Sequence, residues 1–285
     1  MITVFEDIVT YSHLADAFVA CLLSAVTCGI VGSYVVARRM VFLSGGITHA
    51  SFGGLGIAIY AGHNPILGAL LFASLASVGV EFASRHGRIR EDSAIGIIWS
   101  LGMAIGALFM SLTPGYAVEL SSYLFGSISL VDSTDIKWLS ILMAAILIGA
   151  LAWGRRIMYI TFDEEYARSQ GIPVTLTSYI MAVVVAITIV LSIKVMGIVL
   201  LMSLITIPTV VANTLTKDFR RITPIAVITA LICNIVGFVM SYEIELTSGG
   251  IPLGSCIIFL LAMTLLLVKL FDYCRRHVAT RSSRG

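Results

Sequence analysis

Long apolar runs separated by short charged breaks recur along this chain. Runs of about 20 apolar residues each suffice to cross a hydrocarbon core of roughly 30 Å as a helix. The segment 119–131 is too short and too polar to cross, and we interpret it as a re-entrant or half-depth helix. The pattern predicts spans at 13–37, 47–62, 64–84, 93–112, 134–159, 173–193, 195–213, 222–242 and 253–273.

Composition narrows the class of protein. Of 285 residues, 58% are hydrophobic and 12% are charged, with a mean hydropathy of +1.01. A soluble domain carries about 25% charged residues. The fold class is therefore predicted as all-α, a polytopic helical membrane protein with about 8–10 transmembrane helices. We expect residues 1–285 to form a single transmembrane domain, in contact with membrane lipid and without a nucleic-acid partner.

The charges are distributed unequally between the two sides of this topology. Of the 18 Lys and Arg residues, all but Lys137 and Lys194 fall on one side, which the positive-inside rule makes cytoplasmic. The carboxyl terminus, with a basic tail at about 274–285, is then inside. Lys194 is expected at the outer surface, where its side chain can extend (snorkel) so that the ammonium group reaches water. The opposite, outer side carries seven acidic residues: Glu6, Asp7, Glu119, Asp132, Asp135, Glu243 and Glu245.

The first thirteen residues contain no Lys or Arg, so no cleavable signal peptide is evident.

A histidine lies between two glycine pairs in the second predicted span. His49 follows Gly45-Gly46 and precedes Gly53-Gly54. An imidazole at bilayer depth requires a polar partner, a water-filled path or a ligand. Paired glycines either let helices pack closely or interrupt a helix and free its carbonyls. From the residues alone, a hydrogen-bonded core histidine is favoured over a ligand on a route through the membrane.

The longest internal polar loop covers about 154–173. Thr161 is the predicted cap of a short helix, acidic residues fill its first turn and Gly171 ends it. Pro173 then begins the next span. Such a helix either receives force from a soluble partner or covers the end of the bundle, and both interpretations stay open.

Some features bear on transport and on energy supply. Pro208 inside an apolar run predicts a kink or break, which is either a hinge lining a path or a tolerated irregularity. Most of the eleven methionines are expected in the core, with Met196 and Met202 as candidates to face a transport path.

The chain contains neither the phosphate-binding motif Gly-x-x-x-x-Gly-Lys-Ser/Thr nor the metalloprotease motif His-Glu-x-x-His. We therefore predict no enzyme and no bound cofactor, with any ATP hydrolysis performed by a separate chain.

Several short motifs, in order, resemble one family. Together they cover nearly the whole chain and resemble the permease subunit of zinc-, manganese- and iron-type ABC importers. The motifs are Arg39-Met40-x-Phe42, Thr48-His49-Ala50, Glu91-Asp92-Ser93-Ala94-Ile95-Gly96, Tyr123-Leu124-Phe125-Gly126-Ser127-Ile128, the loop from Phe162 to Gly171, Lys194-Val195-Met196-Gly197-Ile198, Ile207-Pro208 and Ser248-Gly249-Gly250.

The resemblance implies a bundle of the type II ABC importer kind in a bacterial cytoplasmic membrane. It further implies a homodimer, a separate ABC ATPase, and an extracytoplasmic metal-binding protein that delivers the transported ion. In this family the loop helix contacts the ATPase. Its coupling residues here would be Asp163, Glu164, Glu165, Tyr166, Ala167 and Gly171.

The chain departs from the family at one metal-site position. The family pattern Gly-Asp-x-x-Ser/Thr-His-Ala has a carboxylate where this chain has Gly45, so only His49 carries over. Imidazole with few oxygen ligands suits zinc better than manganese. Thr48, Ser44, freed carbonyls near Gly45 and Gly46, or water would complete the site. Gly45, Gly46 and Pro208 are predicted to line or hinge the path.

Other functions stay open beside zinc import. Manganese or iron import by the same machinery is one. A secondary cation transporter independent of ATP is another, although such a protein needs titratable groups deep in the bundle. The sequence offers only His49, Asp16 and Glu81 for that purpose.

Overall fold

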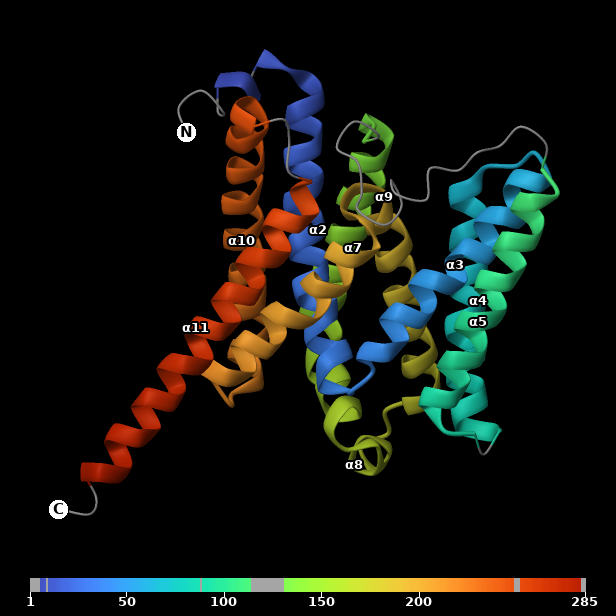
Figure 1. Cartoon of the computed structure of the whole chain (residues 1–285). Coiled ribbons are helices and arrows are strands. Elements are labelled where there is room, and N and C mark those ends of the chain that lie inside the picture. Colours follow the sequence, from blue (N-terminus) through green and yellow to red (C-terminus); the bar gives the residue numbers. More distant parts are fainter. Residues whose placement is uncertain (1–5, 9, 88, 114–130, 249–251, 283–285) are drawn as a thin grey trace.

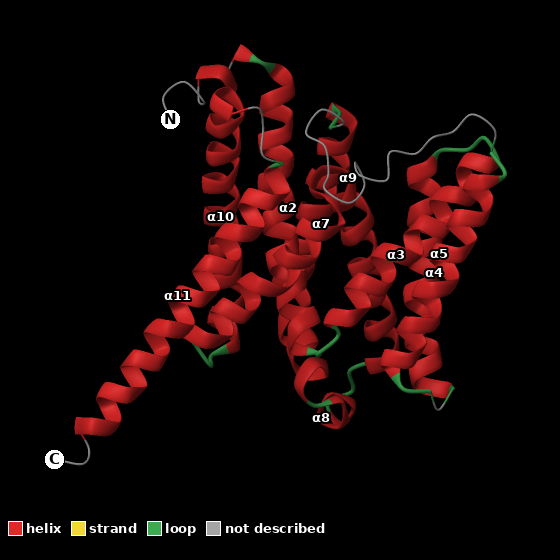
Figure 2. Cartoon of the chain, viewed as in Figure 1, coloured by secondary structure: helices red, strands yellow, loops and turns green. Residues whose placement is uncertain are grey.

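The computed structural model describes residues 6–8, 10–87, 89–113, 131–248 and 252–282, and within them the secondary structure is helical (Figures 1 and 2). The segment interpreted as a re-entrant helix and the motif from Tyr123 to Ile128 lie outside these ranges, apart from residue 131. The helices are α2 (Ser12–Ala37), α3 (Val41–Tyr60), α4 (Pro65–His86), α5 (Glu91–Ser111), α7 (Ser133–Phe162), α8 (Glu164–Ser169), α9 (Val174–Leu215), α10 (Phe219–Ser248) and α11 (Leu253–Ser282).

Eight of the described helices, all except α8, are long and apolar enough to cross a membrane. They cover every predicted span, and the spans 173–193 and 195–213 fall together in α9. At 1.5 Å per residue, its 42 residues would measure about 63 Å, twice the hydrocarbon thickness. The chain reverses instead at Gly197, where φ is 72° and ψ is 165°. That region of backbone space is essentially restricted to glycine.

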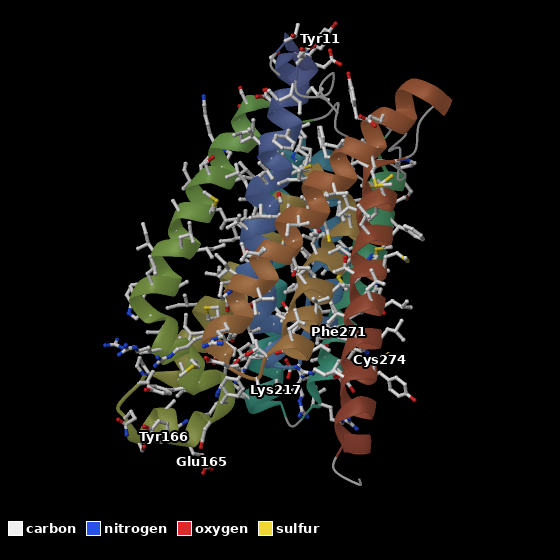
Figure 3. The ribbon with its side chains drawn as sticks, turned by 90° about the vertical axis from the view of Figure 1, so that its left-hand side faces the viewer. Tyr11, Glu165, Tyr166, Lys217, Phe271 and Cys274 are labelled. Atoms are coloured by element: carbon white, nitrogen blue, oxygen red, sulfur yellow. The ribbon has the colours of Figure 1, made fainter. Side chains whose placement is uncertain are left out.

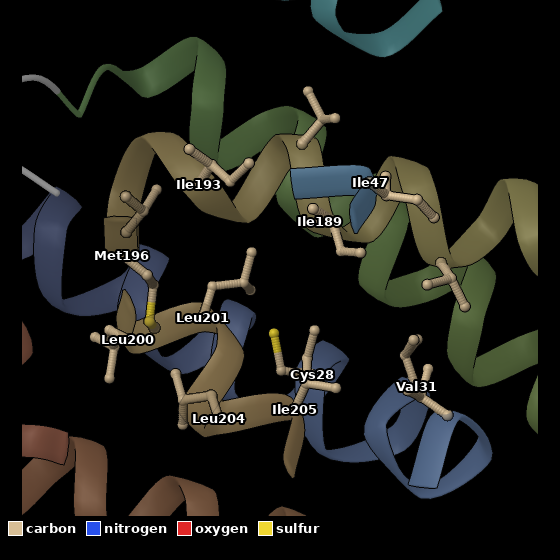
Figure 4. Packing of buried hydrophobic residues seen from close by; sticks show 14 of the residues in the cluster. Cys28, Val31, Ile47, Ile189, Ile193, Met196, Leu200, Leu201, Leu204 and Ile205 are labelled. Atoms are coloured by element: carbon tan, nitrogen blue, oxygen red, sulfur yellow. The ribbon is translucent and has the colours of Figure 1, made fainter. Parts of the chain in front are cut away.

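The two limbs of α9 fold against each other and form the centre of the core (Figure 4). Ile189 and Ile193 lie on the first limb, and Leu201 and Ile205 on the second; all four belong to the buried cluster. Pro208, predicted to kink or break this span, lies inside the second limb and does not interrupt the helix. Gly197 is the residue at which α9 leaves the helical conformation.

Helix α3 is continuous, which corrects the prediction of a span that begins at residue 47. It begins at Val41 and runs through Gly45 and Gly46, so the backbone carbonyls there are not freed. Its later glycines allow close approach to α4 and α5. A Cβ on Gly53 would lie 2.8 Å from the carbonyl oxygen of Gly102, and one on Gly54 would collide with Gly68. The small residues of this span are therefore packing positions.

Large apolar side chains cover the outside of the bundle, and small polar ones are buried among the apolar residues of the core. Leu67, Leu71 and Leu75 repeat along the exposed face of α4. Inside, the hydroxyl groups of Thr27 and Ser33 donate hydrogen bonds to carbonyls of their own helix. A water-soluble protein rarely exposes so continuous an apolar surface, whereas in lipid such a surface is favourable. The chain is a multi-pass membrane protein.

Charged groups gather at the two ends of the bundle. Figure 3 shows Tyr11 at one end, and Tyr166 of α8 with Lys217 at the other. Lys194, expected to snorkel freely, instead pairs with Asp135 of α7, with Nζ 2.6 Å from Oδ2. This pair fixes the start of α7 against the first limb of α9 near the reversal.

Candidate functional site

His49 projects from α3 onto α5. Its ring stacks on Trp99, with ring centroids 4.5 Å apart and an interplanar angle of 4°. The side chain is half-buried. Within the described residues neither ring nitrogen has a hydrogen-bond partner, so the hydrogen-bonded core histidine considered from the sequence is not what the structure shows. Stacking orients the ring and leaves a nitrogen lone pair for a ligand.

The two hydroxyl groups proposed to assist His49 are held within α3. Both residues are buried. The Thr48 hydroxyl donates to the Ser44 carbonyl at 2.6 Å, and the Ser44 hydroxyl donates to the Val41 carbonyl at 2.7 Å. Their oxygen lone pairs are available, but neither hydroxyl is free to turn toward an ion without losing a hydrogen bond.

The space beside Gly45, where the family pattern has aspartate, is occupied by a side chain of α9. A Cβ placed on Gly45 would lie 3.1 Å from Cε and 3.7 Å from Sδ of Met202. The same sulfur lies 3.4 Å from Oγ of Ser44. On the opposite flank of α3, Gly46 packs on Ile95 of α5. The structure therefore replaces the missing carboxylate with a thioether.

The residues do not form a closed metal site. Among the described residues, no group of three or more His, Cys, Asp and Glu side chains could hold a metal ion. A structural zinc site has four protein ligands and retains its ion. The single imidazole of His49 is not such a site.

Helix α8 is built as a compact turn between α7 and α9. The Asp163 carboxylate accepts a hydrogen bond from the Tyr166 backbone N–H at 2.9 Å, so Asp163 caps the helix. The prediction that Thr161 is the cap is wrong, because its hydroxyl donates to the Ile157 carbonyl within α7. Gly171 follows the helix with φ of 73°, as its predicted role as a stop requires. Ala167 is fully buried beneath the turn.

Glu164 ties α8 to the membrane helices. Its carboxylate accepts hydrogen bonds from Arg38, at the end of α2, at 2.7 Å and from Arg85 of α4 at 3.2 Å. Arg85 also pairs with Glu81 and donates to Ser178 of α9 at 2.9 Å. Partial burial raises the pKa of the Glu164 carboxyl, but the two arginines lower it by more, and the pKa lies below its ordinary value.

The outer face of α8 is open. Glu165 and Arg168 are exposed, and Tyr166 is 46% exposed at the tip of the turn (Figure 3). The Tyr166 ring meets Tyr159 of α7 edge-on at 5.4 Å, which fixes its direction. Of the predicted coupling residues, Glu164 and Ala167 face the bundle, Glu165 is exposed, and Tyr166 touches Tyr159 with part of its ring and leaves the rest exposed.

A cavity of about 490 Å³ opens between the ends of α9 and α11 on the α8 side. Its lining includes Lys217, Lys269, Asn213 and Asp272. Two ammonium groups outnumber the one carboxylate and disfavour a cation, and the lining includes no residue of α3. It is therefore separate from the surroundings of His49.

Comparison with known proteins defines the family. Residues 10–271 match the ABC 3 transport family. The chain belongs to this family. The ABC 3 chain is 36% identical over 247 residues to a probable metal transport system membrane protein of Thermotoga maritima, covering 87% of each protein. It is 28% identical over 282 residues to the manganese transport system membrane protein MntC of Halalkalibacterium halodurans, covering 99% of this chain and 94% of that protein.

A solved structure confirms the fold of the ABC 3 chain. PsaBC from Streptococcus pneumoniae in complex with Fab superposes with a TM-score of 0.81 at 23% identity, covering 94% of this chain and 95% of that one. The predicted all-α permease bundle and the predicted resemblance are confirmed. Sequence reasoning missed the Trp99 stack, the sulfur beside Gly45 and the inward direction of Glu164, each of which depends on which helices are neighbours.

Proposed function

We propose that this chain is the permease subunit of an ATP-driven ABC importer that moves a divalent transition-metal ion, zinc, into the cytoplasm. The observation that carries the proposal is His49, an imidazole that has no hydrogen-bond partner among the described residues and lies on a helix of an ABC 3 transport protein. The relatives named for metal or manganese transport support the class of cargo.

The donor set favours zinc over manganese. Manganese prefers carboxylate and water oxygens, whereas imidazole suits zinc. The family aspartate position is Gly45, and no carboxylate replaces it there. Weak coordination by few ligands lets the ion leave, as transport requires.

We place the path at the interface of two copies of the chain, in a bacterial cytoplasmic membrane with the carboxyl terminus inside. An extracytoplasmic metal-binding protein delivers the ion, and two ABC ATPase subunits dock against the α8 end. ATP favours the closed ATPase dimer, which displaces α8 and changes the side on which the path is open. Differential binding of ATP to the two states supplies the free energy.

Within this mechanism the residues of α8 have two distinct roles. Tyr166 and Glu165, on the outer face, contact the ATPase. Glu164, on the inner face, carries the displacement to α2 and α4 through Arg38 and Arg85. A helix held only by apolar contacts would slide, whereas the ion pairs give α8 a fixed position relative to both helices.

Tyr166→Ala is expected to weaken ATPase binding, because it removes a directed aromatic ring from the exposed face of α8. Aromatic anchors at interface centres contribute about 2 kcal/mol or more, so retention of the ATPase during purification should fall at least roughly tenfold. The measurement is co-purification of the ATPase subunit with the tagged chain from membranes.

Tyr11→Ala is the matched control. Tyr11 is 59% exposed and lies at the opposite end of the bundle (Figure 3). The control should retain the ATPase as the unaltered chain does. Full retention by Tyr166→Ala would instead mean that α8 only covers the end of the bundle.

A further inference from the structure

The thioether of Met202 lies beside Gly45, one turn of α3 before His49. Gly45 and His49 are four residues apart, so they are neighbours on one face, with roughly 5–6 Å between Cβ positions. The Met202 sulfur lies 3.7 Å from the Cβ position of Gly45. Methionine has three rotatable side-chain bonds, so its sulfur can approach an ion held by the His49 ring.

Glycine at position 45 leaves room for this arrangement. A Cβ there would lie 3.1 Å from Met202 Cε and 3.7 Å from its sulfur, so the rest of an aspartate side chain would compete with the thioether for the same space. Met202 is also incompletely buried, unlike Met196 on the same helix, which is 1% exposed in the core (Figure 4). Of these two methionines, Met202 is the one whose sulfur lies against α3, beside Gly45 and Ser44 and one helical turn before His49.

The thioether and the imidazole prefer similar metal ions. A neutral thioether and a neutral imidazole together form a soft to borderline donor pair without a negative charge. Such a pair favours zinc and softer ions over manganese, which prefers hard anionic oxygen. Without a charged ligand the pair also binds weakly.

We propose that Met202 and His49 form a two-donor transit site, and that the Met202 sulfur sets the preference for thiophilic metal ions over manganese. This inference rests on the proposed function, because it assigns the selectivity of the same path. The competing explanation is that Met202 only fills the gap beside Gly45, in which case any apolar side chain of equal volume would serve.

The first test separates sulfur from volume. The complex with its ATPase is reconstituted into vesicles, and uptake of ⁶⁵Zn and ⁵⁴Mn is measured from one mixture. Met202→Leu conserves volume and removes the sulfur. We expect the ratio of zinc to manganese uptake to fall about tenfold. Met196→Leu, the same change in the core, should leave the ratio unaltered. An unaltered ratio in Met202→Leu would overturn the inference.

A second measurement does not depend on transport. With Cys256 and Cys274 replaced by serine, Met202→Cys introduces a thiol whose labelling by a small hydrophilic reagent can be timed. The remaining cysteines, Cys21, Cys28 and Cys233, are buried. Zinc should slow labelling several-fold and manganese should not, and His49→Ala should abolish the protection. Equal labelling rates with and without zinc would contradict the site.

The two measurements distinguish this inference from the proposed function. If the unaltered complex accumulates neither ion although zinc protects the introduced thiol, the proposed function fails and the two-donor site stands. If zinc accumulates but the ratio and the labelling are insensitive to position 202, the proposed function stands and the inference about Met202 is wrong.

Discussion

His49→Ala is expected to lower ATP-dependent zinc uptake by about 100-fold while the complex with the ATPase still assembles. The substitution removes a nitrogen donor that has no hydrogen-bond partner within the described residues, so it breaks no internal polar contact. It leaves space over Trp99, where the ring now stacks at 4.5 Å. The loss corresponds to about 3 kcal/mol of stabilisation along the path. The measurement is ⁶⁵Zn uptake by reconstituted vesicles.

His63→Ala is the control for this experiment. His63 is exposed in the turn between α3 and α4, and one of its ring nitrogens lies 2.8 Å from the Ala61 carbonyl oxygen. Its replacement should leave zinc uptake unchanged. Normal uptake in His49→Ala, with both variants assembled to equal amounts, would dismiss the imidazole as a donor on the path.

Glu164→Gln is expected to uncouple ATP hydrolysis from transport, with the ATPase still bound. The variant keeps the shape of the side chain but leaves Arg38 and Arg85 without their shared carboxylate. Partly buried charge-assisted hydrogen bonds contribute about 1.5–3 kcal/mol. We therefore expect zinc transported per ATP hydrolysed to fall about tenfold, measured as the ratio of uptake to phosphate release.

The pH dependence follows from the lowered pKa of Glu164. A carboxyl whose pKa is lower in the folded state contributes stability above its unfolded pKa, and that stability is lost as the pH falls through the lowered value. In the neutral range the carboxylate is ionised and its ion pairs with Arg38 and Arg85 are present. The zinc transported per ATP hydrolysed should therefore not vary across the neutral pH range because of Glu164.

Asp92→Asn is the control for Glu164→Gln. Asp92 lies at the start of α5 and makes an exposed pair with Arg90 at 3.7 Å. Such exposed pairs contribute little, so coupling should be unchanged. Release of the ATPase by Glu164→Gln would show a direct contact with the partner and contradict the inward role.

The helices and their order could be predicted because hydrophobic length is a local property of the sequence. Each of the nine predicted spans falls on a described helix, and Gly197 reverses the chain close to the predicted boundary between the sixth and seventh. Pro208 stays inside the helix, as the alternative of a tolerated irregularity allowed, because neighbouring helices can accommodate a proline in a membrane span. Gly197 was not singled out, since a glycine's φ depends on the packing of both limbs.

Only those parts of the candidate site that depend on the local sequence could be predicted. His49 and the loop helix stand out as polar residues in an apolar chain. The partners of His49 and Glu164 come from other helices, at separations that local patterns do not specify. Arg38 and Glu164 are 126 residues apart, and Ser44 and Met202 are 158 apart. Only the packed bundle brings them together.

The most direct test of this account is zinc accumulation in vesicles that contain the purified chain and its ATPase. The account predicts that ATP supplied on the α8 side drives ⁶⁵Zn to the same side against its gradient, and that a proton ionophore has no effect. Accumulation that ignores ATP and collapses with the ionophore would indicate a secondary transporter and contradict the account. Failure to accumulate any transition-metal ion would contradict it entirely.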